Sequence, residues 1–90
     1  MHYEGAYTVE LEPDAVTDHI GGNCTVKGNT VSVSRGSVQQ VMGGIQFYVY
    51  SNEGQRTPFY WSYGFIRRIR DAQGKILWEN RNVQKKEAHH

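Results

Sequence analysis

The chain has 90 residues, of which 38% are hydrophobic and 21% are charged, and its formal net charge is +1. This length allows one domain and this composition excludes a disordered chain, while the near-neutral charge favours no class of partner. Its one cysteine, Cys24, excludes an internal disulfide, so we expect a cytoplasmic protein.

The first predicted element is a half-buried strand near the N-terminus. Residues 5–12 alternate between apolar and polar side chains, so Tyr7, Val9 and Leu11 face one side of the strand. Pro13 follows and ends the strand, because proline cannot donate a hydrogen bond to a neighbouring strand.

Residues 23–34 predict a β-hairpin with a two-residue turn at Gly28 and Asn29, both at positive φ. The predicted pairs are Lys27 with Thr30, Val26 with Val31, Thr25 with Ser32 and Cys24 with Val33. This register places every apolar side chain of the hairpin on one face, which supports it.

Residues 37–42 fit two structures equally well. They form either one helical turn, begun by Ser37 and ended by the two glycines at 43–44, or a continuing strand with a glycine kink. Residues 45–50 then predict a strand with its aliphatic and phenylalanine side chains inward. Tyr48 and Tyr50 are expected on its outer face.

The last predicted element is a long β-hairpin, rich in aromatic residues and arginines, over residues 59–81. A type I turn at 71–74 with Gly74 in the left-handed region closes it. The predicted pairs are Arg70 with Ile76, Ile69 with Leu77, Arg68 with Trp78 and Arg67 with Glu79. In this register Trp61 faces the core and Trp78 the surface, unless a bulge at Gly64 swaps the faces beyond it.

These elements predict an all-β fold: a small antiparallel barrel or sandwich of about six strands, with one short helical turn if residues 37–42 are helical. We expect a single domain over residues 1–83 and a polar tail over 84–90. His89 and His90 are either native residues or part of an expression tag.

Catalysis and metal binding have little support in the sequence. Asp18 and His19 are adjacent, so their side chains usually point apart, and Cys24 lies on an apolar face where a thiol is inert packing. The histidines and cysteine lack ligand spacing, and the glycines form no phosphate loop, so we expect no metal and no cofactor. We predict that the protein is not an enzyme; an enzyme using Asp18 and His19 is the weakest alternative.

We also expect no membrane partner. No apolar run approaches the roughly 20 residues that span a bilayer. The residues at 1–4 lack the basic start and apolar run of a signal peptide.

Charge is spread unevenly along the chain. Residues 1–20 contain five acidic residues and no Lys or Arg, whereas residues 58–90 contain seven Lys or Arg and three acidic residues. Two interpretations carry equal weight. Either the two ends neutralise each other, within the fold or in a homodimer, or the arginines form an exposed basic patch.

The candidate partner-binding residues are Tyr48, Tyr50, Tyr60, Arg68, Arg70, Lys75 and Trp78. Tyrosine, tryptophan and arginine dominate the hot spots of protein interfaces. The same residue types stack on bases and pair with phosphates in single-strand-binding β-barrels. The plainest interpretation is ordinary cross-strand packing, with Arg68 covering Trp78.

We predict a small, non-enzymatic binding domain that acts by protein–protein contact. An inhibitor or adaptor, such as a small phage or mobile-element protein, is suggested by size alone, and a homodimer is a second form of protein contact. The alternative is a single-stranded nucleic-acid-binding β-barrel that uses the hairpin at 59–81. We rank it lower because a net charge of +1 is small for a nucleic-acid binder.

Overall fold

The computed structural model describes residues 1–15 and 22–80, which form an antiparallel all-β fold of the predicted class. Its elements are β1 (His2–Leu11), β2 (Cys24–Lys27), β3 (Thr30–Val41), β4 (Gly44–Tyr50), β5 (Arg56–Ser62), the 3-10 turn η1 (Tyr63–Phe65), β6 (Ile66–Asp71) and β7 (Ile76–Glu79). The described residues form seven strands, where about six were expected. Within the described ranges, no helix is long and apolar enough to cross a bilayer.

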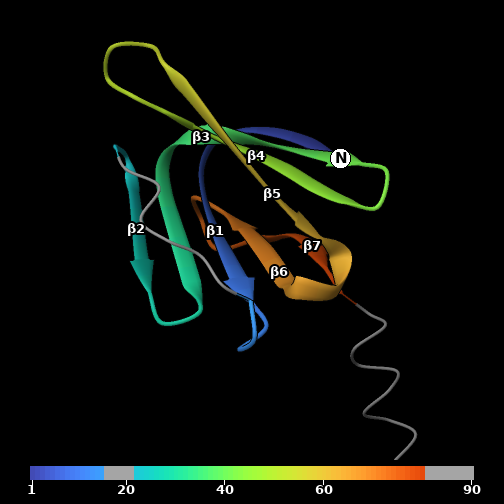
Figure 1. Cartoon of the computed structure of the whole chain (residues 1–90). Helices are drawn as coiled ribbons and strands as arrows, with labels where there is room; N and C mark the ends of the chain where they lie inside the picture. Colours follow the sequence, from blue (N-terminus) through green and yellow to red (C-terminus); the bar gives the residue numbers. More distant parts are fainter. Residues whose placement is uncertain (16–21, 81–90) are drawn as a thin grey trace, which may run out of the picture.

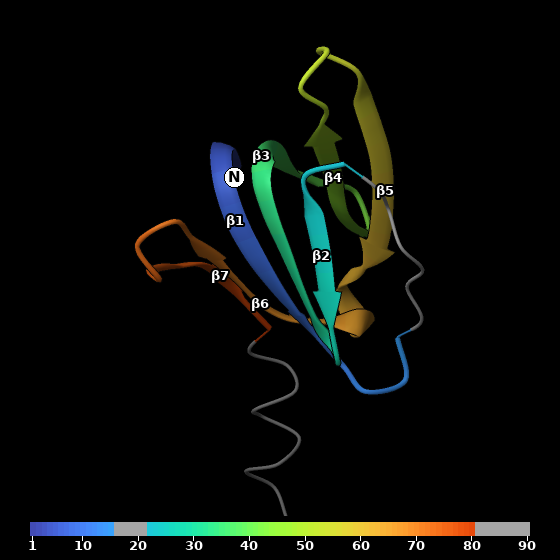
Figure 2. The same cartoon turned by 90° about the vertical axis from the view of Figure 1, so that its left-hand side faces the viewer.

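One sheet joins all the strands in the order β5–β4–β3–β1–β6–β7, with β2 beside the first half of β3. The long strands β1 and β3 bend, so each belongs to two layers. The β4 layer contains β5, β4, the second half of β3 and the first half of β1. The β6 layer contains β2, the remaining halves of β3 and β1, and β6 and β7. Figure 1 shows β4 and β5 in the upper part of the view with β6 and β7 below them, and in Figure 2 these two pairs of strands lie on opposite sides of β1 and β3.

Two glycines allow this bend. Gly5 and Gly36 lie opposite each other, and the β1–β3 register shifts directly after Gly5. A Cβ atom at Gly36 would overlap the backbone carbonyl oxygen of Tyr48, so only glycine permits this close approach. Across the bend, the Tyr7 hydroxyl donates a hydrogen bond of 3.1 Å to the same carbonyl oxygen and ties the two layers together.

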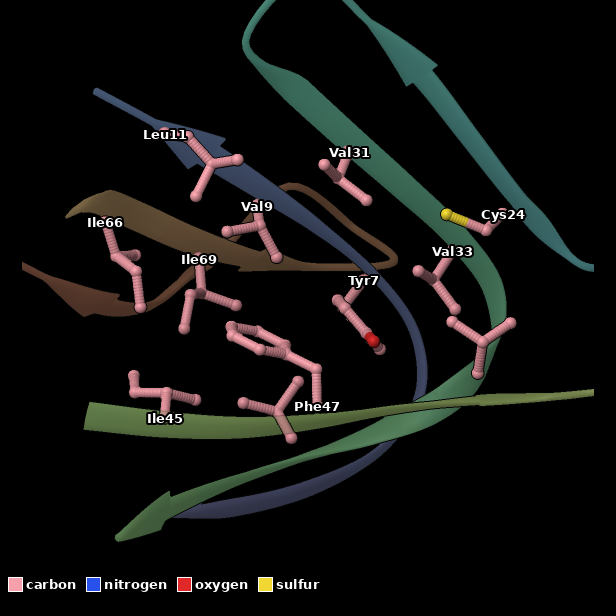
Figure 3. Close-up of a cluster of buried hydrophobic side chains, with 12 residues drawn as sticks. Tyr7, Val9, Leu11, Cys24, Val31, Val33, Ile45, Phe47, Ile66 and Ile69 are labelled. Carbon is pink, nitrogen blue, oxygen red and sulfur yellow. The ribbon is translucent and has the colours of Figure 1, made fainter. Parts of the chain in front are cut away.

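The core lies between the two layers. Figure 3 shows Ile45 and Phe47 of β4 facing Val9 of β1 and Ile69 of β6. All four side chains are fully buried. The predicted inward faces of residues 5–12 and 45–50 are therefore confirmed, and each follows from the two-residue period of a strand with one buried face.

The predicted hairpin at 23–34 is confirmed in position and register. Gly28 adopts φ +62°, but no residue other than glycine has positive φ in the described ranges, so the prediction for Asn29 was wrong. The Asn29 side-chain amide instead donates a 2.7 Å hydrogen bond to the Leu11 carbonyl, which fixes this turn against β1.

Residues 37–41 continue strand β3, and the helical alternative for 37–42 was wrong. This part of β3 is hydrogen-bonded to β4 on one side and β1 on the other, and this pairing outweighs the local capping signal of Ser37. Met42 and Gly43 then form a two-residue turn in which Gly43 has φ +81°.

The single long hairpin predicted over 59–81 was wrong. β5 pairs with β4, whereas β6 pairs with β1, so the two strands lie in different layers. The turn η1 joins them and swaps the inward face: Ile66 is fully buried and Phe65 is 41% exposed. The predicted alternative of swapped faces beyond Gly64 holds at Ile66 only, because an irregularity between Ile66 and Arg68 in the pairing with β1 returns the odd-numbered Ile69 to the inside.

Within residues 59–80, β6 and β7 form a hairpin, and its register departs from the prediction after the first pair. Arg70 lies opposite Ile76 and Gly74 has φ +85°, as predicted. Leu77 is then an extra residue in β7, so Trp78 lies opposite Ile69 instead of Arg68. Trp78 consequently packs against the core, and the prediction that it faces the surface was wrong.

Candidate functional site

The outer side of β1, β6 and β7 carries a network of ion pairs, which we call the paired face. It consists of Glu10, Glu12, Arg67, Arg68, Arg70 and Glu79. Glu10 lies at the centre, with one carboxylate oxygen 3.0 Å from Arg68 Nη1 and the other 3.0 Å from Arg70 Nε. Arg68 also approaches Glu79 at 3.2 Å, and Arg67 approaches Glu12 at 3.2 Å.

Among the described residues, Glu10 and Glu12 of the acidic N-terminal part therefore neutralise arginines of the basic C-terminal part within the fold. The second half of β1 pairs directly with β6, so the glutamates of one strand lie opposite the arginines of the other. Lys75 lies apart at the exposed tip of the β6–β7 hairpin. Of the three cationic residues predicted to bind a partner, Arg68 and Arg70 are thus ion-paired with carboxylates within the chain.

The outer side of the β4 layer carries the three predicted tyrosines, and we call this surface the tyrosine face. It consists of Tyr48, Tyr50, Tyr60, Met42, Gln46 and Arg56. Tyr60 of β5 lies opposite Gln46 of β4, in the middle of the face. Tyr48 and Tyr50 follow along β4 at two-residue spacing, which keeps all three tyrosines on one side of the sheet.

Tyr60 is held on the sheet by a glycine. Its ring reaches diagonally across to Gly44, where an added Cβ atom would overlap the ring and the backbone carbonyl of Trp61. Because Gly44 has no side chain, the ring can lie against the backbone of β4. Tyr60 nevertheless remains 46% exposed, so a large part of it faces solvent.

Tyr50 is also fixed by its neighbours. Its hydroxyl lies 3.1 Å from Glu4 Oε1 and donates a hydrogen bond to it. The guanidinium carbon of Arg56 lies 5.1 Å from the centre of the Tyr50 ring, a distance at which cation–π attraction acts. Tyr48 lies between these residues and Tyr60 and is half-buried.

Met42 is a further exposed residue of this face that sequence reasoning missed. It occupies the two-residue β3–β4 turn and its side chain is 98% exposed. The Gly43-Gly44 pair after it was the available signal. A two-residue turn places its first residue at a hairpin tip, where an apolar side chain cannot be covered by its own strands.

Among the described residues, the titratable side chains of Tyr7 and Cys24 are buried in the core. Burial raises the pKa of the Tyr7 hydroxyl far above its usual value, and the nearby Cys24 and Tyr50 raise it further. Cys24 is buried in the core, as predicted for a packing thiol. Asp18 and His19, and the tail at 84–90, lie outside the described residues. The described ranges contain no group of three or more potential metal ligands.

The predicted site residues thus divide between places. Tyr48, Tyr50 and Tyr60 lie together on the tyrosine face, whereas Arg68 and Arg70 belong to the paired face. Lys75 lies at a hairpin tip. Trp78 is half-buried, and its ring centre lies 5.4 Å from that of Tyr63, on which it stacks. Comparison of the chain with family models, curated proteins and solved structures found no match.

Proposed function

We propose that this chain is a small, non-enzymatic binding domain that contacts a protein partner through its tyrosine face. One observation carries the proposal: three tyrosines lie together on the outer side of one layer, and the exposed Met42 lies in the β3–β4 turn at the end of that layer. Tyrosine and methionine are enriched in protein interfaces, where they supply large contact areas of mixed polarity.

The tyrosine face is also ordered before any partner arrives. Tyr60 rests on Gly44, and Tyr50 is held by Glu4 and Arg56. Side chains that are already fixed lose less conformational entropy on binding, so more of the contact energy appears as affinity. These tyrosines therefore suit the role of binding hot spots.

The nucleic-acid alternative has lost its main support. A single-strand binder needs cations that track the phosphates beside the aromatic side chains. Arg68 and Arg70 share the carboxylate of Glu10 and lie on the other layer from Tyr60. Of the residues of the tyrosine face, Arg56 alone is cationic, whereas a protein partner requires no row of cations, and so it remains the better proposal.

Within this proposal, the partner is a second protein whose surface the domain occupies, as an inhibitor or an adaptor in the cytoplasm would. A second copy of the chain is the alternative partner. Both forms of contact predict the same hot spots, because both would cover the tyrosine face.

Site-specific photocrosslinking tests the proposal. Benzoylphenylalanine replaces Met42 or Tyr48 on the tyrosine face, or Ser32 on the exposed outer side of the β6 layer as a control. After irradiation in a nuclease-treated lysate of the producing organism, we expect one protein product from positions 42 and 48 and none from 32. Equal products from all three positions, or products that disappear with nuclease, would contradict the proposal.

The purified partner then allows an affinity measurement. Tyr60→Ala is expected to weaken binding about 30-fold, the effect of losing a hot spot worth about 2 kcal/mol. Ile76→Ala is the matched control, because Ile76 is 42% exposed against 46% for Tyr60 but lies on β7. Isothermal titration calorimetry gives both dissociation constants, and equal losses would place the interface elsewhere.

A further inference from the structure

The outer edge of β5 presents backbone groups that point away from β4. The Tyr63 backbone N–H donates to the Gly43 carbonyl at 3.3 Å, so the odd-numbered residues of β5 point their backbone groups toward β4. Tyr60 and Ser62 consequently point theirs away from β4. In the part of the chain that the structure describes, no strand pairs with this edge, and β5 ends the strand order.

Pro58 limits how much of this edge can be used. It is an even-numbered residue, so its nitrogen faces the outer edge, where proline lacks the N–H that a neighbouring strand would need. The usable part is therefore the short stretch at 60–62. Pro58 also disfavours pairing of β5 with β5 of a second copy over its whole length.

An apolar cavity opens beside this stretch. It has a volume of about 240 Å³ and is lined by Trp61, Phe65, Ala15 and Asp14. Trp61 lies on the inner side of β5, since its ring packs edge-on against Phe47 at 5.5 Å. A side chain directly opposite Trp61 on an added strand would thus point toward the cavity.

The charge of Asp14 favours a cationic side chain near the cavity. Asp14 is exposed at the rim of the cavity, and none of the described residues forms an ion pair with it. A cationic side chain two residues from the inserted apolar one would lie on the same side of an added strand and reach this carboxylate.

We propose that the edge of β5 at 60–62 binds an extended segment of the partner protein as an added strand. The segment has the pattern apolar–any–basic: its apolar side chain fills the cavity at Trp61 and Phe65, and its Lys or Arg pairs with Asp14. This inference rests on the proposed function and adds the chemistry of the bound segment. Hydrogen bonds to Tyr60 and Ser62 supply affinity, and the cavity supplies specificity.

Synthetic peptides test the inference directly. The probe is an acetylated, amidated eight-residue peptide with a central Leu-Thr-Lys flanked by threonine and glutamine. Its controls replace the leucine by aspartate, the lysine by glutamate, or N-methylate the central threonine. We expect the probe to shift the backbone amide signals of Tyr60 and Ser62 in two-dimensional ¹H–¹⁵N NMR, and each control to bind less tightly.

Two variants locate the contact on the protein. Phe65→Ser should weaken peptide binding about tenfold, whereas Ile76→Ser, a matched change at an apolar residue of nearly equal exposure (42% against 41%), should leave it unchanged. Asp14→Asn should weaken it two- to threefold, roughly the effect of an exposed ion pair, with Glu53→Gln as its control. Unchanged NMR spectra outside the cavity show that each variant is folded.

Several results would overturn the inference. The first is that about 1 mM peptide, the weak end of measurable affinity, shifts neither Tyr60 nor Ser62. The second is that the N-methylated control binds as tightly as the probe. The third is that the signals at 60–62 shift with protein concentration alone. The last result would identify a second copy of the chain as the occupant. If Phe65→Ser leaves binding of a partner crosslinked through positions 42 and 48 intact, this inference fails while the proposed function stands.

Discussion

The paired face and the tyrosine face differ in how their polar and aromatic groups are used. On the paired face, Arg68 and Arg70 share Glu10 at 3.0 Å each, so the charges are satisfied inside the chain. On the tyrosine face, Tyr60 is 46% exposed and Met42 is 98% exposed. Surface composition alone therefore does not identify a binding site, because it does not tell which side chains are paired with each other and which large side chains stay exposed.

Each face has one half-buried tryptophan beneath its outermost strand, Trp61 under β5 and Trp78 under β7. Trp61 packs on Phe59 at 5.0 Å and Trp78 stacks on Tyr63 at 5.4 Å. Trp61→Ala and Trp78→Ala should each lower the free energy of unfolding by about 2–4 kcal/mol, somewhat less than for fully buried tryptophans. Urea denaturation measures both free energies of unfolding. A loss of stability for Trp61→Ala alone would mean that Trp78 lies at the surface and not against the core.

Removing the central carboxylate should turn the paired face into a basic patch. Glu10→Gln leaves two arginines without their shared partner and should cost about 1–2 kcal/mol of stability, between the values for exposed and buried pairs. It should also raise affinity for single-stranded oligonucleotides, with a stronger dependence on salt. Fluorescence anisotropy measures the oligonucleotide affinity of Glu10→Gln. The control is Glu53→Gln, which makes an equal charge change in an exposed loop. No difference between the two variants would mean that Glu10 does not mask the arginines.

Tyr7 connects the layers that carry the two faces. Tyr7→Phe removes its hydrogen bond to the Tyr48 carbonyl and should cost about 1 kcal/mol at neutral pH. Burial raises the pKa of Tyr7, so above pH about 10 the unfolded chain loses this proton and the folded chain keeps it. Stability of the unsubstituted protein should therefore fall more steeply above this pH than that of Tyr7→Phe. Parallel alkaline curves would show that Tyr7 ionises while folded.

The smallest expected effect on stability is that of Met42→Ser. Since Met42 is 98% exposed, its loss should change the free energy of unfolding by less than about 0.5 kcal/mol. Binding of the crosslinked partner should nevertheless weaken measurably, because the side chain belongs to the tyrosine face. If the variant binds as tightly as the unsubstituted chain, Met42 does not contribute to binding and the contact is made by the tyrosines.

Local signals in the sequence were sufficient where the structure is local. The Gly28 turn and the alternation around Val9 fix the pairing or the buried face of a strand within a few residues, and both predictions hold. The pairing of β1 with β6 joins residues 58 positions apart, as in Glu10 with Arg68, and no turn residue encodes it.

The site was predictable only in part for the same reason. Tyr48 and Tyr50 followed from alternation along one strand, and they do lie on its outer side. Trp78 was misplaced by one extra residue, Leu77, since a single-residue shift exchanges the two faces of a strand. Whether Arg68 was paired depended on which strand lies beside it, which is a property of the whole fold.

The distant pairing of β1 and β6 also sets the order in which this chain can fold. During synthesis β1 is made before β6, so β3 can pair with β1 early, and β4 can pair with β3. Until β6 is complete, the second half of β1 keeps an open edge and the core lacks Ile66 and Ile69. Such non-local pairing favours folding in milliseconds to seconds rather than microseconds. A chain released before β6 would expose an apolar strand to other chains and be prone to aggregate.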